Sequence, residues 1–137
     1  MNPYRVYQHA RDTGLPRIDI LLGAFDAVLN GIEQLAGLQL RDTPPARALR
    51  ARCMAILATL AVGTDDTGGD LAVTLRRLYE FATHCLADGA LDKIQAAERV
   101  LHTLREAFQG VRADAVQREH AGQIPALGQT WAVQVSA

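Results

Sequence analysis

The chain has 137 residues and a net charge of −1, with 49% apolar and 21% charged residues. This size and composition are typical of one globular domain with its own apolar core. The near-neutral charge argues against a strong electrostatic attraction to nucleic acid or to an anionic membrane surface. The sequence has neither an apolar run near the roughly 18 residues of a membrane span nor a secretory signal. We therefore expect a cytoplasmic protein.

The first ten residues, MNPYRVYQHA, carry aromatic and apolar groups although they form the free end of the chain. Chain termini are usually polar and frayed. Tyr4, Val6 and Tyr7 are expected either to cover an apolar groove that a partner also uses, or simply to fasten the N-terminal segment to the rest of the domain.

Apolar residues repeat at three- and four-residue steps between residues 14 and 37, which predicts an amphipathic helix. Pro16 suits its first turn and Gly37 its end. Gly23 and Gly31 lie inside this helix, where each costs about 1 kcal/mol relative to alanine. We expect these two glycines to permit the close approach of another helix or peptide. The predicted apolar face is Ile18, Leu21, Leu22, Phe25, Val28, Leu29, Ile32 and Leu35.

The same periodicity predicts three more helices between residues 41 and 112. Thr43 suits the N-cap of the second helix because two prolines follow it. After a turn at residues 64–70, Asp70 is expected to cap the third helix, and Asp92 to begin the fourth. The predicted apolar stripes are Leu49, Cys53, Ile56, Leu57 and Leu60 in the second helix, Leu71, Leu75, Leu78, Tyr79, Ala82 and Leu86 in the third, and Ile94, Ala97, Leu101, Leu104, Phe108 and Val111 in the fourth.

Four amphipathic helices with short links favour an all-α fold, an antiparallel four-helix bundle, over residues 1–119 with an extended N-terminal segment. Residues 120–137 differ, because glycines and a proline disfavour a helix there. Trp131, Val133 and Val135 then alternate with polar or small residues at the period of a strand. This non-helical tail is expected to be flexible, to dock in a groove of its own chain, or to pair with a neighbouring molecule in a homo-oligomer.

The sequence lacks the motifs of an enzyme or a metal protein. Its histidines are dispersed, and CxxC, HExxH and ExxH patterns are absent. Gly68 and Gly69 are not followed by the lysine of a phosphate-binding loop. Cys53 and Cys85 fall in apolar helical patterns and are expected to be free thiols in the core. We predict no catalytic residue, no metal, no cofactor and no nucleic-acid partner.

Four motifs follow one another along the chain. They are N-P-Y-x-x-Y at residues 2–7, then Thr13 with Pro16, then Gly68-Gly69 followed by Ala72, Leu75, Leu78 and Tyr79, and finally Leu101, Leu104, Arg105, Ala107 and Phe108. Together, over roughly residues 2–112, these motifs resemble those of the flagellar secretion chaperone family, FliS type. No single motif is specific, but their order and spacing are specific jointly.

The resemblance implies a cytoplasmic export chaperone that binds the C-terminal region of flagellin, prevents premature polymerisation and aids presentation to the export apparatus. A flagellin end that folds only in the filament has amphipathic segments that apolar grooves of a helical bundle would accommodate. An adaptor or structural bundle that binds another amphipathic helix, without an export role, is the alternative. The expected flagellin-binding residues are Tyr4, Val6, Tyr7, Leu71, Leu75, Leu78 and Tyr79, of which the last four also suit a place in the core.

Overall fold

The computed structural model describes residues 16–39, 42–64 and 69–122. Within these ranges it contains five helices and no strand: α2 (Arg17–Gly37), α3 (Pro44–Gly63), α4 (Gly69–Asp88), α5 (Leu91–Gly110) and α6 (Arg112–His120). The described part of the chain is therefore all-helical, as the apolar periodicity predicts. None of its helices is long and apolar enough to cross a bilayer.

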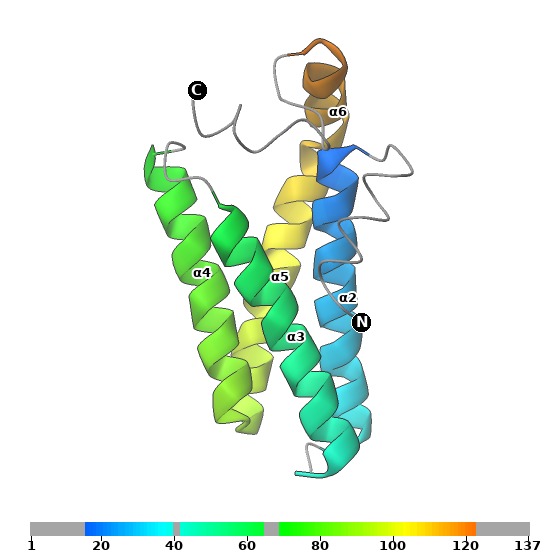
Figure 1. Cartoon of the computed structure of the whole chain (residues 1–137), viewed down its shortest axis with the longest axis vertical. Coiled ribbons are helices and arrows are strands. Elements are labelled where there is room, and N and C mark those ends of the chain that lie inside the picture. The colour runs from blue at the N-terminus through cyan, green and yellow to red at the C-terminus, as the bar shows by residue number, and fades with distance from the viewer. Residues whose placement is uncertain (1–15, 40–41, 65–68, 123–137) are drawn as a thin grey trace.

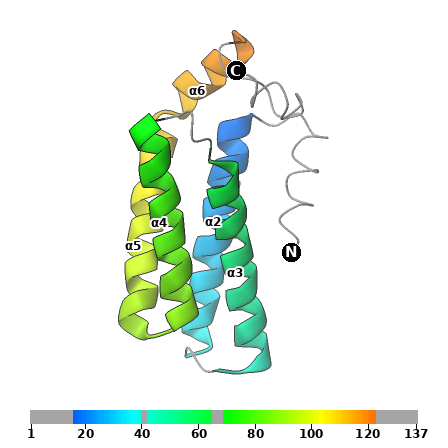
Figure 2. The same ribbon diagram turned by 60° about the vertical axis from the view of Figure 1, so that its left-hand side comes forward.

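The four longer helices lie side by side and alternate in direction along the chain (Figure 1). Contacts join α2 to α3, α3 to α4, α4 to α5, and α5 back to α2, so these helices surround one core. Together, α2 to α5 form the helical body. The short helix α6 lies at the end of this body where α2 begins and α5 ends (Figure 2).

Local sequence explains where these helices begin. The Thr43 hydroxyl accepts a hydrogen bond from the Ala46 N–H at 3.4 Å, which confirms the predicted N-cap of α3. The prediction for Asp70 is wrong by one residue, because α4 already begins at Gly69, and Asp70 lies inside the first turn. Its carboxylate still has a favourable position there, near the positive end of the helix dipole.

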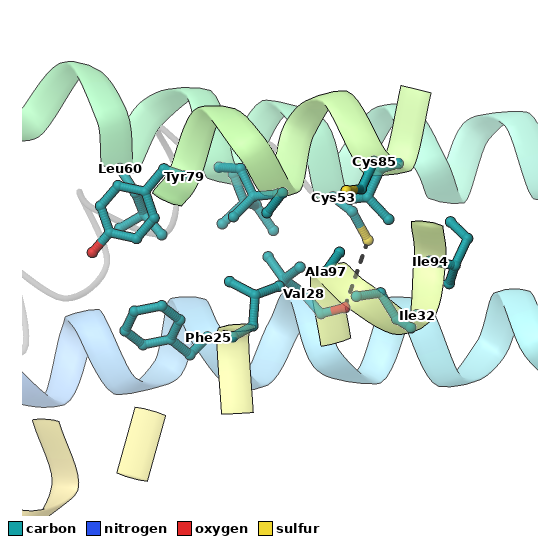
Figure 3. Packing of buried hydrophobic residues seen from close by; sticks show 14 residues of the cluster. Phe25, Val28, Ile32, Cys53, Leu60, Tyr79, Cys85, Ile94 and Ala97 are labelled. Atoms are coloured by element: carbon teal, nitrogen blue, oxygen red, sulfur yellow. Dashed lines mark hydrogen bonds between the residues drawn. The ribbon is translucent and has the colours of Figure 1, made fainter. Parts of the chain in front are cut away.

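The predicted apolar faces meet in the core of the helical body (Figure 3). Phe25 is fully buried, and its ring centroid lies 6.2 Å from that of Tyr79 and 5.7 Å from that of Phe108. Cys53 and Cys85 are both buried free thiols, as predicted. Burial raises the pKa of the Cys53 thiol above its ordinary value.

One of the two glycines inside α2 lies where a neighbouring helix approaches closely. A Cβ at Gly31 would overlap the Cys53 sulfur of α3, and that sulfur also lies 3.8 Å from the Val28 carbonyl oxygen (Figure 3). At Gly23 a Cβ would have no described atom within 4 Å outside its own stretch of helix. The predicted close approach is therefore confirmed at Gly31, whereas in the described part of the chain nothing approaches Gly23.

Two residues of the predicted apolar stripes are exposed. Leu71 is 70% exposed and Val111 is 51% exposed. Both lie at the same end of the helical body, Leu71 in the first turn of α4 and Val111 directly after α5. The described helices therefore leave these two side chains largely uncovered at that end.

The C-terminal part of the described chain also differs from its prediction. The fourth predicted helix ends at Gly110, and a separate helix, α6, follows Val111. His120, the first residue of the predicted tail, is the last residue of α6. Residues 123–137 of that tail lie outside the described residues, as do Tyr4, Val6 and Tyr7.

Candidate partner-binding surface

A hydrogen bond from Arg76 shows which flank of α4 faces α3. Arg76 donates from Nη2 to the carbonyl oxygen of Thr64, directly after α3, at 3.0 Å. The flank of α4 that carries Arg76 therefore faces α3. Leu71, Leu78 and Phe81 follow one another at seven- and three-residue steps on the opposite flank. That flank lies on the side of α5, the other neighbour of α4.

An ion pair orients α5 in the same way. Arg105 donates from Nε to the Asp26 Oδ1 of α2 at 2.5 Å, so the flank of α5 that carries Arg105 faces α2. The other flank carries Val100, Leu104 and Val111 at four- and seven-residue steps. These apolar side chains therefore lie on the side of α4.

The apolar side chains of these two flanks are here named the α4–α5 face. Its members are Leu71, Leu78, Phe81, Val100, Leu104 and Val111, of which Leu104 also packs against the core cluster. Leu71, Phe81 and Val111 are 70%, 43% and 51% exposed, respectively, and the other members are half-buried. The two helices diverge toward the end that carries Leu71 and Val111 (Figure 1). Because large exposed apolar side chains on a folded domain can mark a site of interaction, this face is the candidate site.

The structure divides the predicted site residues of α4 between this face and the core. Leu71 is exposed on the face and Leu78 is half-buried on it. Leu75 packs against the core cluster, and Tyr79 is 3% exposed beside Phe25 (Figure 3). In the free chain, Leu71 and Leu78 are therefore accessible to a partner, whereas Tyr79 supports α4 from inside.

Sequence reasoning did not assign Phe81, Val100 or Val111 to a binding surface. Phe81 lies off the predicted stripe, and its position three residues after Leu78 is the available signal. Val100 and Val111 can be assigned to this face only once it is known which flank of α5 faces α2. The contact between Arg105 and Asp26 shows this.

The α4–α5 face offers apolar contact rather than chemistry. Within residues 16–39, 42–64 and 69–122, no three of the histidine, cysteine, aspartate and glutamate side chains gather closely enough to hold a metal ion. A surface of leucine, valine and phenylalanine side chains suits an amphipathic polypeptide segment.

A protein-family model described as "Flagellar protein FliS" matches residues 1–115. The chain belongs to the FliS family. Membership confirms the resemblance drawn from the motifs, and it implies a flagellar export chaperone. FliS is a family of chaperones rather than of enzymes, which agrees with the predicted absence of catalysis. Comparisons with curated proteins and with solved structures give no match.

The match to FliS ends inside α6, which contacts the first turn of α2. Arg112 donates from Nε and Nη2 to the two carboxylate oxygens of Asp19, at 2.6 and 2.9 Å. These hydrogen bonds from the Arg112 guanidinium hold the pKa of Asp19 below its ordinary value of 3.8. A group with a depressed folded-state pKa stabilises the fold above its unfolded-state pKa.

The free energy of unfolding of this FliS-family chain is therefore expected to exceed that of its Asp19→Asn variant by an amount that depends on pH. At pH 7 the variant should unfold at lower urea concentration, because the amide loses the charge-assisted pair. The difference should shrink as the pH falls below about 4, since Asp19 becomes protonated in the unfolded chain and then in the folded one. Urea titrations at pH 7 and pH 3 measure it, with Asp114→Asn as the control on the exposed face of α6. A difference that is equal at both pH values would contradict this assignment.

Proposed function

We propose that the chain is a cytoplasmic export chaperone that binds the C-terminal region of flagellin through the α4–α5 face. In this role it keeps flagellin from polymerising early and aids its secretion. The observation that carries the proposal is the exposure of Leu71, Phe81 and Val111, large apolar side chains on the flanks of α4 and α5. Membership in a family of flagellar proteins supports flagellin as the partner.

The physical basis is coupled folding and binding. The C-terminal region of flagellin folds in the filament, and before assembly its amphipathic segments have no apolar surface to pack against. An antiparallel bundle of four helices with an uncovered apolar face supplies one, at the cost of ordering the guest segment. Because Leu71, Leu78 and Phe81 lie at helical steps along α4, a guest helix would pack along α4 and α5.

Tyr4, Val6 and Tyr7 are included in the proposal as residues that cover an apolar groove in the free protein. They would shift or contribute contacts when flagellin binds. A Tyr7→Ala variant tests this part. An unchanged flagellin affinity at unchanged stability would leave Tyr7 only the role of fastening the N-terminal segment.

The whole proposal is tested by titrating the purified chain with the last ~40 residues of the flagellin from the same source, a length suited to coupled folding. Saturable binding with a gain of helical circular dichroism and a negative heat-capacity change is the expected result. An unrelated amphipathic helix serves as the second ligand. Binding of that helix but not of flagellin would favour the adaptor alternative, and binding of neither would refute both.

The α4–α5 face is tested by replacing Leu71 with glutamine. Loss of one leucine contact is expected to weaken flagellin binding about tenfold. The thermal midpoint should hardly change, because the side chain is 70% exposed in the free chain. Calorimetric titration and thermal unfolding measure the two effects.

Val62→Gln is the matched control for Leu71→Gln. Val62 is 87% exposed and apolar, but it lies on α3, outside the face. Its replacement should leave the affinity unchanged. Equal affinities for the wild type and for the double variant Leu71→Gln/Phe81→Gln would exclude the α4–α5 face as the binding site.

A further inference from the structure

Helix α6 is attached to the helical body without burying any of its residues. Ala115 and Val116 are half-buried, and no residue of α6 is fully buried. A helix of nine residues is too short to be stable in water by itself. Its helical state therefore depends on the contacts that hold it against α2.

The hydrogen bonds between α6 and α2 involve charged side chains and lie at both ends of α6, on either side of the half-buried Ala115 and Val116. At the start, Arg112 makes its two hydrogen bonds to Asp19. At the end, Glu119 Oε2 accepts a hydrogen bond from the Arg17 backbone N–H at 3.0 Å. Arg112 and Asp19 are partly exposed, so dissolved salt has access to this contact.

Glu119 supplies the side-chain acceptor that the N-cap residue of α2 does not provide. The N-cap residue of α2 is Pro16, whose side chain accepts no hydrogen bond from the first turn. The Asp19 N–H bonds back to the Pro16 carbonyl oxygen at 3.0 Å, but the Arg17 N–H cannot do so and needs an acceptor from elsewhere. A carboxylate at a helix N-terminus is favourable. Glu119 supplies one from a position 102 residues further along the chain.

We propose that α6 is a charge-held arm, which opens as a unit while the helical body stays folded. Arg112 and Glu119 hold the arm closed. Opening separates it from α2 and removes the cap from the start of that helix. Ionic strength controls the opening, because the holding contacts are electrostatic and the buried apolar contacts of the body are not.

The arm also links the two ends of the chain. Residues 1–15 join α2 at Pro16, next to the N–H whose hydrogen bond Glu119 accepts, and residues 123–137 begin four positions after Glu119. When the arm is closed, the two points where these segments join the described chain are therefore held together. Opening the arm separates these two points.

Hydrogen–deuterium exchange of the free full-length chain tests the proposal in 50 mM and in 1 M sodium chloride. In the double variant Arg112→Ala/Glu119→Gln, exchange of the α6 amides is expected to be about tenfold faster than in the wild type. The Arg17 amide should also lose protection, since Glu119 accepts its hydrogen bond. The amides of Phe25–Leu35 should be unchanged. High salt should bring the wild type toward the variant.

Arg118→Ala is the matched control. Arg118 pairs with Asp114 at 2.8 Å inside α6, one turn away, and does not hold the arm to α2 by that contact. Its removal should change α6 exchange much less than the double variant does. The proposal is overturned if, in 50 mM sodium chloride, α6 is as well protected in the double variant as in the wild type. It is equally overturned if protection is lost throughout the helical body, because α6 would then not open separately. No flagellin is present, so either result leaves the proposed binding function untouched.

Discussion

Replacement of Phe25 by alanine is expected to lower the free energy of unfolding by about 3–5 kcal/mol. Phe25 has no exposed surface, and its ring lies between Tyr79 of α4 and Phe108 of α5. Truncation removes apolar contacts with both helices and leaves a cavity at the centre of the helical body. Neighbouring side chains would fill it only in part, because the surrounding helices fix their positions.

Urea unfolding followed by far-ultraviolet circular dichroism measures this loss. Phe81→Ala is the control of the same residue type, since Phe81 is 43% exposed and contributes less buried area. A loss of about 1 kcal/mol or less is expected there. If the two variants unfold at similar urea concentrations, the central position of Phe25 in the core is wrong.

Replacement of Gly31 by alanine is expected to destabilise the chain by about 1–3 kcal/mol, although alanine is the better helix former. The new methyl group would overlap the buried Cys53 sulfur, so α2 and α3 would have to move apart or Cys53 would have to change its rotamer. Gly23→Ala is the matched control in the same helix. With no described atom near the new methyl group, it should stabilise the chain by about 1 kcal/mol.

A double-mutant cycle shows whether the Cys53 sulfur causes the loss. Cys53→Ala removes the overlapping atom, so Gly31→Ala should cost less in that background than in the wild type. Urea titrations of the four chains measure the coupling. Independent, additive effects would mean that the two positions do not share the close approach between α2 and α3.

The positions of the helices could be predicted because their causes are local. Apolar periodicity and the Thr43 cap with its two prolines involve residues within a few positions of one another, so they can be read along the chain. The family motifs also depend on order and spacing alone. For these reasons the all-helical character, the core position of Phe25 and the relation to flagellar chaperones followed from the sequence.

Only the tertiary structure decided which residues of one predicted helix face are buried and which are exposed. Leu71 and Leu86 belong to the same predicted stripe, yet one is 70% exposed and the other fully buried, because Leu71 lies in the first turn of α4 and Leu86 belongs to the core cluster. Gly23 and Gly31 are equivalent in a helical pattern until α3 approaches one of them. The α4–α5 face and the cap from Glu119 likewise bring together residues that are far apart in the chain. Local periodicity does not predict which distant residues meet.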